Sequence, residues 1–522
     1  MPIITKAGSP VKGSPTQFTL DKAELLTLIS DTYFLDTDNW NTVSLIYKSS
    51  EGNQSNTTKF KADQTFPAAN FAVSLKAKDM FQIHKIVIKD FDNGSLEILR
   101  PALITAGIVA EFDVDMTPAP AYIEAVGTLD SAFCISAVDS KINPGSHYSQ
   151  TMTTAVQSDG KTLIGGAFLN YGGTSGRNKL VRLNSDGTVD SSFCANAVDG
   201  NKFGLYNFIN KIIVQPDGKI LVAGYFTNYA GTTDRNCLIR LNSDGTPDTS
   251  FCNNASDGDK FVGSPIFDID LGSNGKIVVC GDYYNYGGVE GRRHLVRLNS
   301  DGTLDTSFCS NAADGHKFND IPYSVAIQSD GKTLVGGVFT SYNSEVGRDK
   351  LIRLNSDGTL DTAFCNNASD TSKFNNDIRA ISVQPSGKIL VGGLFTNYAG
   401  STGQDRLIRF NSDGTLDTSF CSNAVNGGNF NNTVFSIFSQ QNNKILVGGS
   451  FMNYAGTSGR NKFIRLNSDG TVDASFCSNA VEVGKFDNTV FGIYEKNGDV
   501  FAMGSFTNYA STSGRSYLVK FL

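Results

Sequence analysis

The sequence predicts an all-β protein whose C-terminal part, residues 127–522, is a seven-bladed β-propeller with velcro closure. A Phe-Cys pair occurs seven times at intervals of 56 to 60 residues, a period that suits one four-stranded blade with its loops. Glycine is abundant, with 53 copies among 522 residues, and only 18% of residues are charged, which is typical of short strands joined by tight turns. The two ends of the repeat region also carry complementary fragments of one repeat.

Each repeat is expected to form two β-hairpins. The repeat that ends at Cys252 has β-branched runs separated by Pro-Asp-Gly and Ser-Asp-Gly, the residues that tight turns prefer. Its expected strands are Asn207–Gln215 and Lys219–Phe226, joined by Pro216-Asp217-Gly218, and Cys237–Asn242 and Thr246–Cys252, joined by Ser243-Asp244-Gly245.

The side-chain pattern indicates the type of turn. A three-residue loop at 185–187, with Gly187 in the left-handed region, sets Leu183 opposite Val189 and Arg182 opposite Asp190. Apolar groups then meet on one face of the hairpin and opposite charges on the other. A two-residue loop would set Leu183 against Asp190, because a slip of one residue exchanges the faces.

The offset of the repeats predicts how the ring closes. Gly127–Cys134 (GTLDSAFC) is a fourth strand without the preceding three, and Tyr517–Leu522 (YLVKFL) is a third strand without its fourth. We expect Phe521 to face Leu129 and Lys520 to face Asp130. This closure removes the open edges that an open solenoid, the alternative, would expose.

These residues resemble the delta-60-repeat β-propeller family, whose repeats run GKILVGG, a loop, and RLNSDGTLDTSF. The match is close at Gly331–Phe364, Gly387–Phe420 and Lys444–Phe476 and extends over residues 127–522. The resemblance implies the propeller fold. It implies no activity and no catalytic residues, because one fold serves many functions.

The N-terminal residues 1–115 carry no copy of the repeat and are expected to form a small β-sandwich, followed by a Pro-containing linker at 116–126. One helix is expected at Lys22–Ser30, after a capping box of Asp21 and Glu24. The segment Asp90–Glu97 contains Asp92-Asn93-Gly94, which favours a hairpin turn over a calcium loop, because its oxygen ligands miss the EF-hand spacing. Strands are expected at Thr42–Lys48, Phe71–Lys76, Gln82–Phe91 and Ser95–Leu99.

Composition argues against several classes of partner. The net charge is −7 and no run of Lys or Arg is present, so we expect no nucleic-acid binding. No stretch approaches the roughly 18 apolar residues that span a bilayer, and the start MPIITKAGSPVKG lacks the apolar core of a signal peptide. We therefore expect no membrane insertion and synthesis in the cytoplasm without a signal peptide.

The cysteines and histidines indicate neither disulfides nor a cofactor. Seven of nine cysteines follow the same Phe in successive repeats, and equivalent positions in neighbouring blades should lie beyond the roughly 7 Å Cα limit of a disulfide. We interpret them as small buried residues of a reduced protein. No Cys-x-x-Cys pair exists and four histidines are scattered, so no metal site and no cofactor are expected.

The long loops carry the candidate binding residues. They bring a Tyr from each repeat to one face, suited to a sugar or a protein partner, although residues that recur in every blade favour a structural role. The departures from the repeat, including Arg292, Arg293 and His294, are the better candidates. The recurring tyrosines are Tyr171, Tyr229, Tyr286, Tyr342, Tyr398, Tyr454 and Tyr509.

Asp268 and Asp270 are further departures, in an otherwise apolar first strand. Two carboxylates near a central channel suggest glycoside hydrolysis, but both come from one strand and no second channel carboxylate is evident. No nucleophile elbow, P-loop or HExxH motif is present. We therefore expect no enzyme and no catalytic residues, and keep these two aspartates as candidate binding residues.

The preferred hypothesis is a non-enzymatic structural or adhesive binding protein. Its N-terminal domain would anchor to protein partners in a larger assembly, such as a phage virion with its tail fibers or a contractile-injection particle. The propeller would present a face for adhesion to a host glycan or receptor. The alternatives are an exported bacterial surface protein and, less favoured, a carbohydrate-active enzyme.

Overall fold

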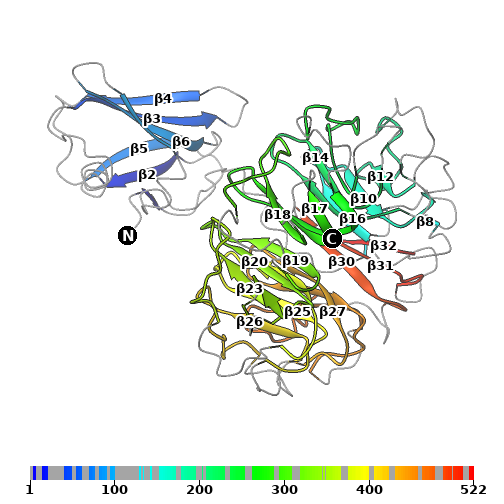
Figure 1. Cartoon of the computed structure of the whole chain (residues 1–522). Helices are drawn as coiled ribbons and strands as arrows, with labels where there is room; N and C mark the ends of the chain where they lie inside the picture. The colour runs from blue at the N-terminus through cyan, green and yellow to red at the C-terminus, as the bar shows by residue number, and fades with distance from the viewer. Residues whose placement is uncertain are drawn as a thin grey trace. The chain divides into compact units, whose positions relative to one another are not determined.

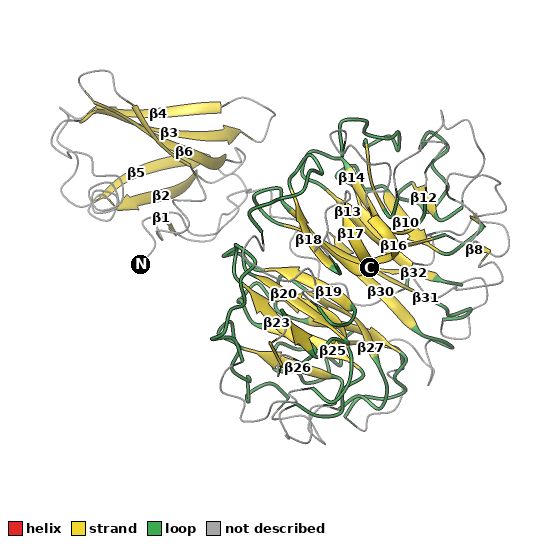
Figure 2. Ribbon diagram, in the orientation of Figure 1, coloured by secondary structure: helices red, strands yellow, loops and turns green. Residues whose placement is uncertain are grey.

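The computed structural model divides the chain into two compact units, Met1–Ile123 and Glu124–Leu522. This boundary falls within the expected linker. The structure describes residues 4–7, 15–21, 40–49, 55–61, 70–76, 81–90, 95–99, 129–130, 133, 142–143, 152–171, 178–194, 203, 207–227, 229, 236–252, 261–286, 293–308, 318–343, 345–346, 349–365, 374–398, 405–421, 429–455, 461–476, 486–496, 498–509 and 516–522. Within these ranges the secondary structure is strand and turn (Figure 2), and no helix has the length and apolarity to cross a membrane.

The N-terminal unit contains two antiparallel sheets, with strand orders β1-β2-β5 and β4-β3-β6-β7 (Figure 1). Strands β3, β5, β6 and β7 confirm the four expected from the sequence, whereas β1, β2 and β4 were not expected. The expected helix at residues 22–30 and the turn at 92–94 lie outside the described residues. The seven strands are β1 (Ile4–Ala7), β2 (Pro15–Asp21), β3 (Trp40–Ser49), β4 (Ser55–Lys61), β5 (Asn70–Lys76), β6 (Phe81–Asp90) and β7 (Ser95–Leu99).

The second unit contains seven three-stranded antiparallel sheets among its described residues. Each sheet has a first strand, a central strand and an outer strand in chain order. The strands are β9 (Met152–Val156), β10 (Thr162–Gly166) and β12 (Leu180–Leu183); β13 (Phe208–Val214), β14 (Ile220–Tyr225) and β15 (Leu238–Leu241); β16 (Phe261–Leu271), β17 (Ile277–Tyr286) and β18 (Leu295–Leu298); β19 (Pro322–Ile327), β20 (Thr333–Gly337) and β23 (Leu351–Leu354); β24 (Ile378–Val383), β25 (Ile389–Gly393) and β26 (Leu407–Phe410); β27 (Val434–Ser439), β28 (Ile445–Gly449) and β29 (Phe463–Leu466); and β30 (Val490–Lys496), β31 (Asp499–Gly504) and β32 (Leu518–Phe521). The unit also contains two short two-stranded sheets: β8 (Ile142–Asn143) with β11 (Asn170–Tyr171), and β21 (Ser341–Tyr342) with β22 (Glu345–Val346).

The first strands follow one another around a common centre. Each contacts the first strand of the next sheet, in the order β9, β13, β16, β19, β24, β27 and β30, and β30 contacts β9. Lys496 Nζ donates a hydrogen bond to the Val156 carbonyl at 2.9 Å, between these last two strands. Neighbouring sheets therefore contact each other through their first strands.

The Ser-Asp-Gly turns confirm the register expected from the side-chain pattern. Leu183 bridges Val189, and the Asp190 N–H donates to the Arg182 carbonyl at 2.9 Å. Gly187 has a φ of 83°, the left-handed conformation that a three-residue loop places on glycine.

The prediction of a full fourth strand in each repeat was wrong, because in the described residues this segment forms a single β-bridge with the outer strand. In the second sheet Leu241 bridges Pro247, and the chain then turns: the Asp248 carboxylate accepts hydrogen bonds from the Ser250 N–H at 3.0 Å and hydroxyl at 2.6 Å. The Phe251 N–H bonds the Asp248 carbonyl at 3.2 Å. A side chain that accepts a hydrogen bond from the backbone N–H two residues later competes with the hydrogen bonds that would extend the strand.

The two ends of the repeat region pair as the register predicts. Leu129 bridges Phe521 in antiparallel fashion, and the Asp130 N–H donates to the Lys520 carbonyl at 2.9 Å. These contacts repeat those between Leu183 and Val189 and between Arg182 and Asp190.

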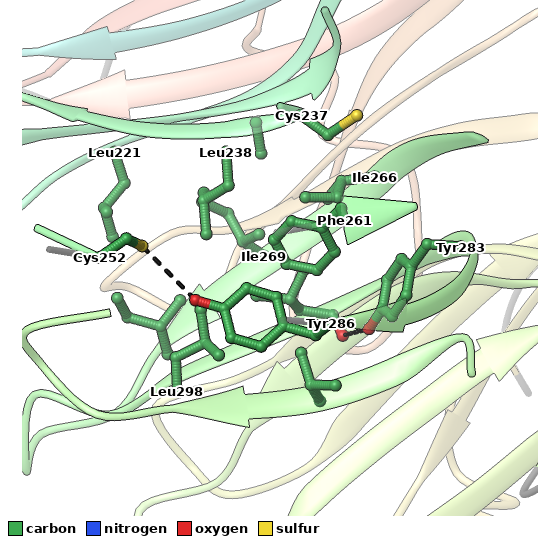
Figure 3. Close-up of a cluster of buried hydrophobic side chains, with 14 of the residues drawn as sticks. Leu221, Cys237, Leu238, Cys252, Phe261, Ile266, Ile269, Tyr283, Tyr286 and Leu298 are labelled. Atoms are coloured by element: carbon green, nitrogen blue, oxygen red, sulfur yellow. Dashed lines mark hydrogen bonds between the residues drawn. The ribbon is translucent and has the colours of Figure 1, made fainter. Parts of the chain in front are cut away.

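The hydrophobic core lies between neighbouring sheets. In one cluster Phe261, Tyr283 and Tyr286 pack against strands of two sheets, and the Tyr286 hydroxyl lies 3.5 Å from Cys252 Sγ (Figure 3). The described cysteines are buried free thiols: Cys194, Cys237, Cys252, Cys280, Cys365 and Cys421. This confirms the burial expected for Cys194, Cys252, Cys365 and Cys421, which follow the repeated Phe.

Candidate functional site

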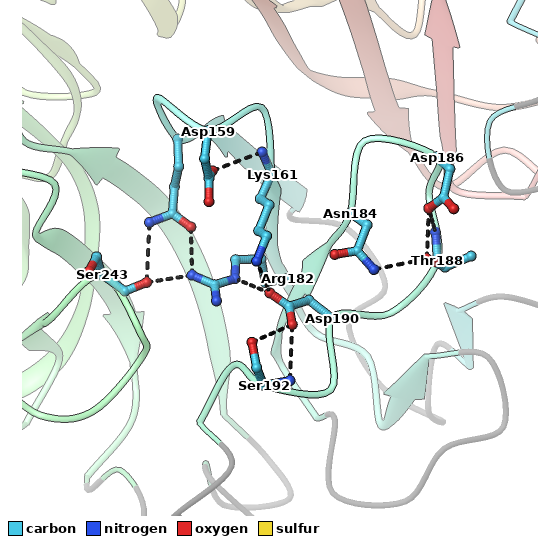
Figure 4. Close-up of polar contacts among 10 residues, drawn as sticks. Asp159, Lys161, Arg182, Asn184, Asp186, Thr188, Asp190, Ser192 and Ser243 are labelled. Atoms are coloured by element: carbon cyan, nitrogen blue, oxygen red, sulfur yellow. Dashed lines mark hydrogen bonds and ion pairs between the residues drawn. The ribbon is translucent and has the colours of Figure 1, made fainter.

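A buried ion-pair cluster connects the outer strand to the next sheet in five of the seven three-stranded sheets that the structure describes. Asp190 Oδ2 accepts from Arg182 Nε at 2.8 Å and from Lys161 Nζ at 2.9 Å (Figure 4). The Arg182 guanidinium lies 4.5 Å over the Phe193 ring and also donates to the Ser243 carbonyl of the next sheet. Burial alone would raise the pKa of Asp190, but hydrogen bonds from Ser192 and Lys161 and the charge of Arg182 hold it well below its usual range.

This cluster recurs with the same geometry, so its role is structural. Each arginine donates to a serine carbonyl of the following sheet in five of the described clusters. The Arg-Asp pairs are Arg182–Asp190, Arg240–Asp248, Arg297–Asp305, Arg353–Asp361, Arg409–Asp417 and Arg465–Asp473.

The candidate tyrosines lie inside the protein. Tyr171, Tyr229, Tyr286, Tyr342, Tyr398, Tyr454 and Tyr509 are all buried. The Tyr229 hydroxyl donates to the Gly245 carbonyl at 2.9 Å, and Tyr342 donates to that of Gly358 at 3.0 Å. Side chains so buried present no surface to a ligand, so their burial favours the structural role over the binding role.

The departure at Arg293 and His294 forms a local cluster with Tyr284. Arg293 lies 5.2 Å over the Tyr284 ring and its Nε donates to His294 Nε2 at 2.7 Å. His294 is buried, and Nδ1 lies 2.8 Å from the Gly281 carbonyl. Burial chiefly lowers the pKa of His294, which leaves the imidazole neutral with Nδ1–H as the donor. Arg292 lies outside the described residues.

Asp268 and Asp270 join three sheets. Asp268 accepts from Lys211 Nζ at 2.8 Å and from the Val325 N–H at 3.1 Å. Asp270 accepts from the Ile327 N–H at 2.7 Å. Burial raises the pKa of Asp270. Both carboxylates therefore bind the neighbouring strand β19 instead of facing each other across a cleft.

A cavity of about 660 Å³ is lined by the first strands of all seven sheets. Asp268, Asp270 and Lys211 contribute to its wall. Six of these strands, β9 excepted, carry a β-bulge, and one residue at each bulge lines the cavity. We call these residues the bulge ring: Asn210, Phe267, Tyr323, Arg379, Phe435 and Phe491.

A glycine on the central strand makes each bulge possible. A Cβ on Gly393 would meet the Asp377 carbonyl oxygen, and a Cβ on Gly504 would meet that of Thr489. The backbone of the bulge thus lies directly over these glycines. The bulge ring was not predicted from the sequence, although one glycine on each of six central strands was its signal: Gly224, Gly281, Gly337, Gly393, Gly449 and Gly504.

Metal ligation has no support within the described part of the chain, where no group of three or more His, Cys, Asp or Glu residues could hold an ion. Asp268, Asp270 and the bulge ring are therefore the groups that the structure brings together at the cavity. They provide four aromatic rings, one guanidinium group, one amide and two carboxylates, the mixture of apolar and polar groups that binding sites contain.

Comparison with known proteins gives a family and a distant structure. No curated protein matches the sequence. The chain is similar in structure to the extracellular domain of a hybrid two component system from B. thetaiotaomicron, with 13% identity and a TM-score of 0.39; the match covers 72% of this chain and 40% of that one. The model of the family described as "Domain of unknown function (DUF5122) beta-propeller" matches residues 157–193, 215–251, 272–308, 328–364, 384–420 and 440–476. The chain therefore belongs to this β-propeller repeat family, through a region that extends over residues 157–476.

Proposed function

We propose that this protein is a non-enzymatic binding protein whose propeller recognises a glycan or protein partner through Tyr284 and Arg293. One observation carries the proposal: the sheet that contains β17 departs from the repeat at two positions that touch each other. Tyr284 is 57% exposed and stacks with Arg293. Exposed aromatic and guanidinium groups are enriched where proteins bind partners.

The other sheets supply the comparison. Thr227, Thr340, Thr396 and Thr507 stand where Tyr284 stands, and Asn178, Asn236 and Asn461 stand where Arg293 stands. In the remaining sheets Leu169 and Met452 stand at the first position, and Asp349, Asp405 and Ser516 stand at the second. No other sheet has an aromatic ring at the first position or a cation at the second, so the pair of Tyr and Arg is specific to this sheet.

The carboxylates support a binding role over an enzymatic one. Asp268 and Asp270 accept hydrogen bonds from backbone N–H groups of β19, so their oxygens are engaged in joining sheets. Glycoside hydrolysis requires two carboxyl groups that flank the scissile bond. Asp268→Asn should therefore release no fewer reducing ends from a bacterial polysaccharide than the wild type does.

The same proposal includes the architecture and location of the protein. We propose seven blades closed by the pairing of residues 129–130 with 520–521, a small N-terminal β-sandwich that docks to protein partners, and incorporation into a phage virion or an extracellular contractile-injection particle. Support comes from the contacts between β30 and β9 and from the separate N-terminal unit. An exported bacterial surface protein of the same build is the second candidate.

The test compares the full-length wild type with Tyr284→Thr/Arg293→Asn on an array of bacterial surface glycans. The double variant carries the residues of the second sheet, Thr227 and Asn236, so it should fold as the wild type does and lose at least about tenfold in binding. Met452→Thr is the control, because Met452 is 54% exposed in another sheet at the position equivalent to Tyr284. Equal binding by the double variant and the wild type would reject the pair as the site.

A further inference from the structure

The central cavity has the size and construction of a small-molecule site. Its volume of about 660 Å³ lies within the range of roughly 300–1,000 Å³ for ligand pockets. Tyr284 and Arg293 do not line it, so any ligand there is independent of the function proposed above.

The bulge ring is the variable part of an otherwise repeated frame. The strands that flank it keep nearly the same residues from sheet to sheet, for example ILVGG in β25 and in β28. The bulge residue is asparagine once, phenylalanine three times, tyrosine once and arginine once. Because a β-bulge re-aims one side chain, the six bulged sheets present four kinds of side chain to the cavity on the same type of backbone.

The ring supplies aromatic surface and one guanidinium group. Phe267 and Tyr323 pack edge to face with centroids 5.0 Å apart, and Phe435 and Phe491 pair at 5.1 Å. These side chains are partly exposed. Arg379 lies 3.9 Å over the Tyr323 ring and its side chain is 28% exposed. The cavity therefore offers a ligand both aromatic ring faces and a neighbouring guanidinium group.

Polar groups follow one residue further along the strands. Lys211, 38% exposed at its side chain, holds Asp268 at 2.8 Å. Ser436 also lines the cavity and is partly exposed. The cavity wall therefore offers a hydroxyl and an ammonium donor beside the aromatic side chains of the bulge ring.

We propose that this cavity binds a sugar residue that carries a carboxylate, such as a uronic acid. The C–H face of the sugar packs on the phenylalanine rings, its carboxylate pairs with Arg379, and its hydroxyl groups bond Lys211 and Ser436. The planar guanidinium fork matches the geometry of a carboxylate, which it can bind through two parallel hydrogen bonds. Arg379 already contacts Asp377 Oδ2 at 2.9 Å, so it has an orientation fixed before the ligand arrives.

The first experiment measures binding to the full-length protein by isothermal titration calorimetry. The probes are glucuronate, galacturonate, glucose and benzoate. Binding of a uronate at least about tenfold tighter than glucose and benzoate supports the proposal, since it requires both the charge and the sugar. Equal binding of glucose removes the role of the carboxylate, tighter benzoate binding replaces the sugar with an aromatic acid, and no uronate binding overturns the proposal.

The second experiment places the ligand. Arg379→Met should weaken uronate binding at least about tenfold and Arg379→Lys less, because lysine keeps the charge but loses the planar fork. Phe435→Ala should weaken every sugar probe. Lys462→Met and Phe208→Ala, which remove a cation and an aromatic ring outside the cavity, should bind as the wild type does. Uronate binding unchanged in Arg379→Met and Phe435→Ala would overturn the site, whatever the Tyr284/Arg293 variant does.

Discussion

Lys520 forms an ion pair with Asp130, with Nζ 3.3 Å from Oδ2, although the two residues lie near opposite ends of the repeat region. Lys520 also lies 3.0 Å from Asp499. In the second sheet the matching positions are an arginine at 240 and a lysine at 219, both bound to Asp248. In the last sheet Asp499 thus stands where the second sheet has a lysine. The carboxylate that corresponds to Asp248 is Asp130, which comes from the start of the repeat region.

Leu129→Asp should destabilise the propeller through this pairing. Leu129 bridges Phe521 and packs against a buried cluster, and a buried unpaired carboxylate costs about 2 kcal/mol or more. Urea unfolding followed by fluorescence measures the loss. Asp159→Asn, in an exposed turn, is the control, and an unchanged midpoint for Leu129→Asp would contradict a structural role for the pairing.

Arg240→Ala should cost far more than Lys219→Ala. The Arg240 and Asp248 side chains are each 8% exposed, and removal of one partner leaves a buried charge, at a cost of about 3–5 kcal/mol. The Lys219 side chain is 32% exposed, so its loss costs about 0–1 kcal/mol. Guanidinium unfolding of both variants gives the two values. Equal costs would mean that the arginine does not hold the cluster together.

Acid should destabilise the propeller cooperatively. Burial by itself would raise the pKa values of the aspartates in the ion-pair clusters, but serine, lysine and arginine partners stabilise the carboxylates and hold these pKa values below the usual range. The aspartates are Asp190, Asp248, Asp305, Asp417 and Asp473. A depressed pKa gives stability that is complete above the unfolded pKa of about 3.9 and falls as pH drops toward the folded pKa.

Thermal unfolding between pH 7 and pH 2 tests this dependence. The wild-type Tm should be flat above about pH 5 and decrease below about pH 4. Asp248→Asn should show a lower Tm at pH 7 and a smaller further decrease in acid. A Tm that rises as pH falls would have the wrong sign for these aspartates.

Gly393→Ala should be strongly destabilising although alanine is small. Its Cβ would meet the Asp377 carbonyl oxygen, which forces the bulge at Arg379 to move, and we expect a loss of about 2 kcal/mol or more. Gly272→Ala is the matched control, because the nearest atom to its Cβ would be the end of the Asn274 side chain and not a backbone atom. Uronate titration of Gly393→Ala should also show weaker binding if the bulge positions Arg379.

The buried thiols should resist modification in the native protein. Burial raises the pKa of Cys237 and of Cys421 to about 11, and the thiolate is the reactive form. Cysteine-resolved mass spectrometry after iodoacetamide at pH 8 should find these two residues unlabelled in buffer and labelled in denaturant. Rapid labelling of both in buffer would show that the sheets open.

Local residue patterns were enough to predict the hairpins. The alternation around Ser185-Asp186-Gly187 placed Leu183 opposite Val189 because one face of the hairpin is buried, and the fragment at Leu129 predicted its partner Phe521 by the same register. The fourth strand was predicted too long because Asp248 binds the backbone of Ser250, a competition that alternation alone does not reveal.

Repetition along the chain favoured a structural role for the candidate tyrosines, but it did not show where their side chains lie. A tyrosine in every repeat indicates a shared position but not whether that position faces solvent, and the structure buries all seven. The pair of Tyr284 and Arg293 required the fold, because its members are brought together by β17 and the chain before β18.

The sequence by itself determined the repeat, the turns and the register, because each depends on residues a few positions apart whose polarity must match one buried face. Only the tertiary structure decided which side chains meet in the cavity. The bulge ring collects single residues from six sheets, and their common direction arises from bulges stacked over glycines, a relationship between neighbouring strands that no single stretch of sequence contains.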